Sequence, residues 1–177
     1  MRSPLTEKQM PNCISQVCSA AMLAFALMMS SASHGNAEGP NVIQASAQSG
    51  VITQKSAYGV EETVARLKKD IAAKGIVFFQ EIDQAALAAK AGIELKPSVL
   101  LIFGNPPLGT QFITANPQAG LDWPVRMLVY RDAQGAVWVA WTDFAWIAKR
   151  HGVSTREAQF HMASEVAASI AASVAAR

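Results

Sequence analysis

The residues of this sequence that could transfer a proton are few and lie far apart along the chain. Asp122 is the carboxylate that ordinary structural roles explain least, because it stands between two apolar residues in a loop bounded by glycine and proline. A general acid or base at that position needs a partner and a pocket. The partner that we consider is His151, and Asp83 is the alternative carboxylate for the same pairing. A cofactor-free enzyme built on one of these pairs is therefore one hypothesis for this chain.

The spacing of the histidines does not favour a metal centre. His151 and His161 are separated by ten residues and by the start of a predicted helix, which is not the spacing of two ligands of one ion. We therefore expect no metal site and no cofactor. The sequence also lacks a Gly-x-Ser-x-Gly elbow, so a serine hydrolase has no support from it.

A turn-rich and uncharged loop follows a dense apolar run. The run over 100–103 predicts a buried strand, and the loop over 104–110 predicts a sharp exit from it into a helix start. The loop lacks the Lys-Ser/Thr end of a nucleotide-binding loop, and its prolines remove amide donors. The amides of the following helix start could still attract an anion or a carbonyl group. A purely structural turn is the simpler interpretation.

The tryptophans lie in the last third of the chain, at Trp123, Trp138, Trp141 and Trp146. Strict alternation along a strand places Trp138 and Trp141 on opposite faces of a sheet, so that one can be in the core and the other at the surface. An exposed tryptophan beside an uncharged loop suits an apolar ligand or a partner protein, although core packing is the plainer role. The ligand surface that we predict consists of Gly104, Asn105, Pro106, Gly109, Thr110, Asp122 and Trp123.

Composition limits the class of protein. Apolar residues make up 51% of the 177 residues and charged residues 16%, which excludes intrinsic disorder and permits a packed core. The formal net charge is +2, and the lysines and arginines are scattered rather than gathered in a basic stripe. We therefore expect no nucleic-acid partner.

The N-terminus predicts a secretory signal peptide over 1–37. Arg2 and Lys8 precede an uncharged apolar stretch over 18–29, which is too short for a comfortable membrane span. Small residues follow this stretch, as they do before the cleavage site of a signal peptide. An uncleaved membrane anchor is the alternative interpretation.

Cleavage is expected after Ala37, with Ser33 as the alternative site. Both cysteines, Cys13 and Cys18, would then leave with the signal peptide, so the mature chain could form no disulfide. A flexible leader is expected over 38–50 because this segment is rich in small and polar residues. We predict a periplasmic protein without a stable membrane span.

Hydrophobic periodicity predicts a series of alternating elements after this leader. The predicted strands cover 51–55, 76–82, 99–103, 125–131 and 137–142. The predicted helices lie between Gly59 and Gly75, over 84–91, from Asn105 to Asn116, over 144–150, and after a capping box formed by Ser154 and Glu157. This order indicates an α+β domain with a mainly antiparallel sheet. The apolar stripe of the last helix is expected to pack on that sheet, with a dimer contact as the alternative.

Several ordered segments resemble one protein family. They are Thr63-Val64-x-x-Leu67, Phe103-Gly104-Asn105-Pro106, Gly109-Thr110, Gly120-Leu121-Asp122-x-Pro124, Leu128-Val129-Tyr130 and Gly135-x-Val137-Trp138-Val139. Over 51–152 the chain is similar to the domain of unknown function 302. This resemblance implies a single α+β domain over 51–177, with a curved sheet in the β-α-β(4)-α order of one TATA-binding-protein repeat. It also implies exported members of the family, but no established activity.

One departure from the family pattern affects function. Members similar to this chain often carry a histidine after an Ile-Asp pair, where this sequence has Ile82-Asp83-Gln84. A metal or proton-transfer role for that histidine therefore does not carry over.

Three functions remain open on the sequence. The leading hypothesis is a non-enzymatic periplasmic domain that binds a small apolar ligand or a protein partner at the loops 104–110 and 121–124. The second is the cofactor-free enzyme near the same loops. The third is a structural homodimer that uses the exposed face of the final helix.

Overall fold

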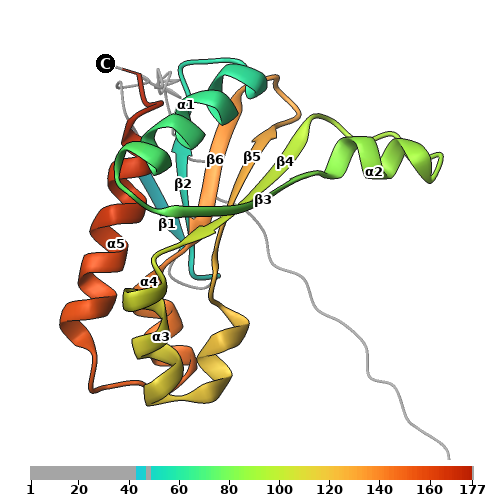
Figure 1. Ribbon diagram of the computed structural model, residues 1–177. Coiled ribbons are helices and arrows are strands. Elements are labelled where there is room, and N and C mark those ends of the chain that lie inside the picture. Colours follow the sequence, from blue (N-terminus) through green and yellow to red (C-terminus); the bar gives the residue numbers. More distant parts are fainter. Residues whose placement is uncertain (1–42, 47–48, 177) are drawn as a thin grey trace, which may run out of the picture. The chain divides into compact units, whose positions relative to one another are not determined.

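A computed structural model describes residues 43–46 and 49–176 of the chain (Figure 1). The predicted signal peptide over 1–37 and both candidate cleavage sites lie outside the described residues. Of the two compact units of the chain, 1–37 and 38–177, the described residues all belong to the second.

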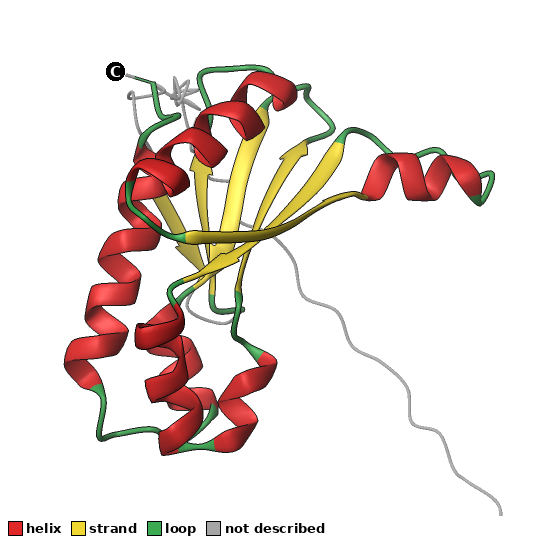
Figure 2. Cartoon of the chain, viewed as in Figure 1, coloured by secondary structure: helices red, strands yellow, loops and turns green. Residues whose placement is uncertain are grey.

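Six antiparallel strands form one sheet in the order β1-β2-β6-β5-β4-β3. They are β1 (Ile43–Ser46), β2 (Val51–Lys55), β3 (Val77–Asp83), β4 (Ser98–Gly104), β5 (Val125–Arg131) and β6 (Val137–Thr142). The helices are α1 (Val60–Ala73), α2 (Gln84–Lys90), α3 (Pro106–Ala115), the short 3-10 helix η1 (Pro117–Leu121), α4 (Phe144–Arg150) and α5 (Glu157–Ala172). Figure 2 shows the strong twist of the sheet and the helices gathered around it. The α+β class and the antiparallel sheet are confirmed.

The topology contains the order that the family resemblance implies. β2, α1, the strands β3 to β6 and α5 follow the β-α-β(4)-α pattern. β1, α2, α3, η1 and α4 are additional elements. The added helices α3, η1 and α4 gather at one end of the sheet, whereas α2 lies at another end, beyond β3 and β4 (Figure 1).

One continuous core joins the sheet to α1 and α5. In α1 the apolar stripe Val60, Val64, Leu67 and Ile71 is buried, as the helical period predicts. The sheet supplies alternate residues that share one face, because paired positions in neighbouring strands point the same way. The buried sheet residues include Leu101, Phe103, Met127, Val129, Val139 and Trp141. The α5 stripe packs into the same core with Phe160, Ala163, Ala167 and Ile170.

Side-chain caps fix the starts of three helices at the predicted residues. Asp83 accepts a hydrogen bond from the amide of Ala86 at 2.8 Å and begins α2. Asn105 accepts from the amide of Leu108 at 3.1 Å and begins α3. Asp143 caps α4 in the same manner. These side chains satisfy amides that a helix leaves unpaired in its first turn.

Three local predictions are wrong. Residues 43–46, expected within a flexible leader over 38–50, form the strand β1. This strand pairs antiparallel with β2, from Ile43 opposite Gln54 to Ser46 opposite Val51, so that backbone groups of the two strands are hydrogen-bonded. The 3-10 helix η1 occupies Pro117–Leu121, where the sequence predicts no helix. The capping box at Ser154 is also absent, because α5 begins only at Glu157 with Arg156 at the N-cap.

The late start of α5 has a physical reason. Val153 is buried, and its amide donates to the carbonyl oxygen of Ala148 at 2.9 Å, so the chain leaving α4 is first drawn into the core. Further residues are then needed to turn the chain before α5 can begin. Packing of one valine therefore outweighs the local capping pattern.

Candidate functional site

The two predicted loops meet at the indole of Trp123. A methyl group added at Gly109 would overlap this ring, and one added at Gly104 would lie 3.1 Å from the indole Nε1. The glycines at the end of β4 and in α3 therefore leave the space that Trp123 occupies. Their role as close neighbours of a tryptophan from the other loop could not be seen from spacing alone.

Beneath Trp123 lies a small apolar pocket between the end of β4, α3, α4 and α5. Its walls are mostly side chains of the core, including Phe103, Leu108, Phe112, Phe144 and Val166. Four residues of the predicted ligand surface also line it, namely Gly104, Asn105, Gly109 and Trp123. Pro106, Thr110 and Asp122 are not among its lining residues.

The pocket is small, and the indole of Trp123 forms part of its wall. Its volume is about 40 Å³, which is enough for a water molecule but far below the roughly 300–1,000 Å³ of a typical ligand site. Trp123 is half-buried, and its ring meets the ring of Phe79 edge-on, with 6.1 Å between the centroids. Phe79 belongs to the edge strand β3 and is exposed.

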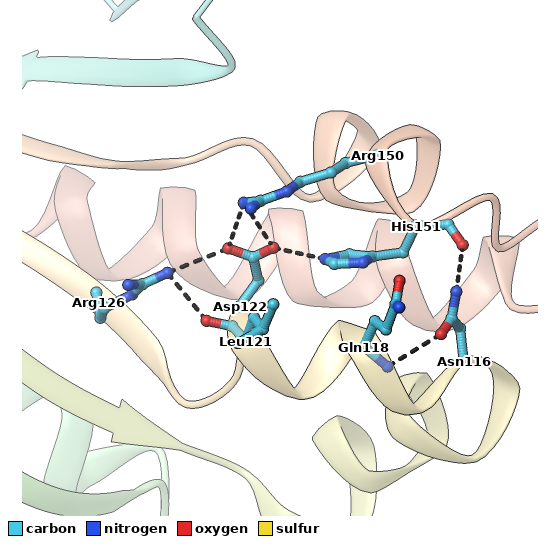
Figure 3. A network of polar contacts seen from close by, with 7 residues as sticks. All are labelled: Asn116, Gln118, Leu121, Asp122, Arg126, Arg150 and His151. Carbon is cyan, nitrogen blue, oxygen red and sulfur yellow. Dashed lines mark hydrogen bonds and ion pairs between the residues drawn. The ribbon is translucent and has the colours of Figure 1, made fainter.

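Asp122 belongs to a separate polar cluster (Figure 3). Its buried carboxylate lies 2.6 Å from Nε2 of His151, and Nη1 of Arg150 is 3.1 Å from the same oxygen, Oδ2. Nη2 of Arg126 donates to the other oxygen, Oδ1, at 3.1 Å. Both guanidinium groups thus donate charge-assisted hydrogen bonds to one carboxylate.

Backbone contacts hold this cluster in place. His151 follows α4 as its C-cap, and its carbonyl oxygen accepts from Nδ2 of Asn116 at 2.7 Å. The side-chain oxygen of Asn116 in turn accepts from the amide of Gln118 at the start of η1. Asp122 follows η1, so these bonds join the end of α4 to both ends of η1 (Figure 3).

The cluster is arranged as a structural clamp rather than as a general base. One carboxylate already accepts from a histidine and two arginines, and it is almost fully buried, so little of it is directed at a substrate. The predicted pair of Asp122 and His151 is brought together. Asp83 is not part of it, because it caps α2, which lies at a different end of the sheet from α4 (Figure 1).

Two residues of this cluster were missed by the sequence reasoning. Arg126 stands four residues after Asp122, and Arg150 stands directly before His151. The available signal was an arginine close in sequence to each member of the predicted pair, Asp122 and His151. Within residues 43–46 and 49–176, no group of three or more histidine, cysteine, aspartate or glutamate side chains could hold a metal ion.

These features define an α+β domain with a small apolar pocket and a buried carboxylate that contacts a histidine and two arginines. The chain belongs to the family described as "Domain of unknown function DUF302", which matches residues 52–176. The crystal structure of an uncharacterized conserved DUF302 protein from Bacillus stearothermophilus has the same fold, with a TM-score of 0.66. The two share 16% sequence identity, and the match covers 71% of this chain and 98% of that chain.

Curated relatives share part of their length with this chain. It is 39% identical over 105 residues to "Fluoride-specific ion channel FluC 1" of Brucella suis biovar 1 (strain 1330), which is 59% of this chain and 41% of that protein. The identity is also 39% to "Fluoride-specific ion channel FluC 2" of Brucella melitensis biotype 1, over 39% of its length. The chain thus spans about two fifths of these relatives. Among the helices that the structure describes, none has the length and apolar character needed to cross a membrane.

Proposed function

We propose that this domain is a non-enzymatic binding module of the periplasm, and that it takes up a small apolar ligand beneath Trp123. The observation that supports this proposal is the meeting of the loops 104–110 and 121–124 over one apolar pocket. The sequence predicts both loops as parts of one ligand surface. The periplasmic location rests on the signal-peptide pattern over 1–37.

The lining of the pocket indicates the chemistry of the ligand. Phenylalanine and leucine side chains surround it, no charged side chain lines it, and Asn105 is the polar residue at its edge. Transfer of a charged or strongly polar molecule into such surroundings is unfavourable. A ligand with an apolar body and at most one polar group, near Asn105, fits best.

Binding needs movement of the indole. The pocket as it stands is too small for a metabolite, and displacement of the Trp123 ring from its wall would enlarge it. Trp123 therefore acts as a cover that the ligand displaces. The glycines at positions 104 and 109 leave the space in which the Trp123 ring lies when the pocket is empty.

The experiment is rescue of a cavity variant by free indole. We expect Trp123→Ala to bind indole, with amide chemical-shift changes confined to 104–110, 121–124 and the pocket side of α5, and with a higher melting temperature. Trp146→Ala is the matched control, because Trp146 is also half-buried and packs against a glycine, Gly50, but does not line the pocket. Indole binding that is equal in both variants, or absent from the first, would contradict the proposal.

The curated relatives favour a second candidate function, that of an accessory module of a membrane channel. Proteins named as fluoride-specific channels contain a segment similar to this chain, and an ion channel must span the membrane. The described helices of this chain supply no such span. We infer that the shared segment would act beside a channel rather than form the conducting path.

This second candidate predicts a change in channel activity. Fluoride efflux from liposomes that contain the Brucella suis relative should change when the segment similar to this chain is deleted, and should return when the purified domain is added. An efflux rate that is indifferent to both changes would remove this candidate and leave the apolar-ligand proposal unaffected.

A further inference from the structure

Residues 84–95, which we call the arm, project beyond the ends of β3 and β4 (Figure 1). The arm contains α2 and the chain that follows it, and no residue of α2 is buried. Leu87, Ile93 and Leu95 are 54%, 61% and 48% exposed. A helix of seven residues is unstable in water without tertiary packing. An apolar arm of this kind therefore indicates a surface that another molecule covers.

A groove lies at the base of the arm, beside the start of α1. It has a volume of about 560 Å³ and is lined by apolar and charged side chains. The apolar part includes Val60, Leu95 and Val99. The charged part consists of Glu61, Glu62, Asp83 and Arg131. Because Ala85 and Leu95 form one wall of the groove, the tip of the same arm cannot fill it.

The tip of the arm and the groove each carry charged residues of both signs. Lys90 and Glu94 stand on either side of the turn at the tip, and Glu61 and Arg131 line the groove. Within the described part of one copy, none of these four side chains makes an ion pair, whereas the neighbouring Glu62 is paired with Arg66 at 2.7 Å. Each charge of the tip thus has an unpaired opposite charge in the groove.

We propose that two copies of this chain associate through a two-fold interface in which the arm tip of each copy enters the groove of the other. The arms would lie antiparallel, with Ile93 beside Leu95 of the partner subunit and Lys90 beside Glu61 of the partner subunit. The alanines of α2 allow two such helices to approach closely. A two-fold axis makes every contact occur twice. This interface meets that requirement, because the arm tip of each copy enters the groove of the other.

This interface differs from a dimer built on the final helix. The apolar stripe of α5 is already buried in the core of its own copy, and its exposed apolar side chain is Met162, at 52%. Met162 is therefore a matched control for Ile93. Both are exposed apolar residues, Met162 within α5 and Ile93 shortly after α2, so a glutamate at either position replaces an exposed apolar side chain.

The experiment is sedimentation equilibrium of the purified protein over a range of concentrations. We expect a monomer–dimer equilibrium whose dissociation constant rises about thirtyfold in Ile93→Glu and is unchanged in Met162→Glu. We also expect Lys90→Glu to weaken the dimer about tenfold, and the double variant Lys90→Glu with Glu61→Lys to restore it. Circular dichroism of each variant checks that the fold is kept.

Several results would overturn this proposal. They are a monomer at millimolar concentration, a dimer that Met162→Glu weakens and Ile93→Glu does not, or a charge reversal at Lys90 that Glu61→Lys fails to restore. None of these results bears on the pocket under Trp123, which lies on other elements.

Discussion

At the scale of single residues, Asp122 shows how burial changes the role of a carboxylate. In the sequence it is the unexplained acidic residue of a loop, which makes it a candidate for acid–base chemistry. In the structure it is buried and accepts from His151, Arg126 and Arg150. Removing such an acceptor leaves three donors facing each other without a counter-charge.

Asp122→Asn is therefore expected to destabilise the fold. We expect a loss of about 2–3 kcal/mol in the free energy of unfolding, less than the roughly 3–5 kcal/mol of a fully buried pair, because both guanidinium groups are half exposed. Urea titration measures this quantity. Glu62→Gln is the control, since it breaks an exposed pair with Arg66 and should cost about 0.5 kcal/mol or less. Equal losses in the two variants would show that the cluster is no clamp.

Asp132 in the β5–β6 turn offers a prediction about pH. The hydrogen bond from Nε1 of Trp138, at 2.7 Å, is the main reason why the pKa of Asp132 lies below its ordinary value, and the amides of Ala136 and Gln134 add to the effect. A folded-state pKa below the unfolded one contributes stability that is complete above about pH 3.9, the ordinary pKa of aspartate. This contribution disappears as the pH falls through the lowered pKa.

Trp138→Phe should move the pKa of Asp132 back toward its ordinary value. The variant keeps an aromatic ring on the strand but lacks the indole N–H donor. NMR titration of the Asp132 carboxyl carbon between about pH 2 and 6 measures the change. We also expect the wild type to lose more stability than the variant as the pH falls below about 3.9, because the variant lacks the contribution of the lowered pKa. A titration curve for Asp132 that is the same in both proteins would contradict this cause.

At the scale of elements, the contact between α3 and the 121–124 loop depends on a glycine. Gly109→Ala should destabilise the fold by about 1–3 kcal/mol, because the new methyl group overlaps the Trp123 ring in a packed region. Gly120→Ala is the control, since its methyl group would meet only Ile113, at an ordinary 3.8 Å. Thermal unfolding of the two variants gives the comparison.

A double variant separates this contact from the helix itself. In a Trp123→Ala background the cost of Gly109→Ala should largely vanish, because the overlapping ring is gone. If the cost persists there, the glycine is required for another reason. The same background serves the indole experiment, so both tests of the pocket share one protein.

At the scale of the whole molecule, the signal-peptide pattern over 1–37 predicts export. We predict that the protein isolated from its own cells is found in the periplasm and begins at Glu38, or at His34 if Ser33 is the cleavage site. Intact-mass measurement of the purified protein distinguishes these starts. A mass that includes residues 1–37 would contradict cleavage and favour the anchor.

Local patterns predicted most of the elements, and tertiary packing explains the exceptions. The α1 stripe and the caps Asp83, Asn105 and Asp143 depend on neighbours within a few residues, so their signals are contained in the sequence. The capping box at Ser154 failed because the burial of Val153 sets the path of the chain. β1 was missed because its pairing with β2 compensates for a composition typical of a leader.

The sequence alone determined the α+β class, the family and the loops on which a binding site could be built, because hydrophobic period and turn chemistry act over short distances. Only the tertiary structure decided that Trp123 lines the pocket, that two arginines contact Asp122, and that the arm stands beside a charged groove. These are contacts between residues far apart in the chain, and their geometry follows from how the sheet twists and the helices pack upon it.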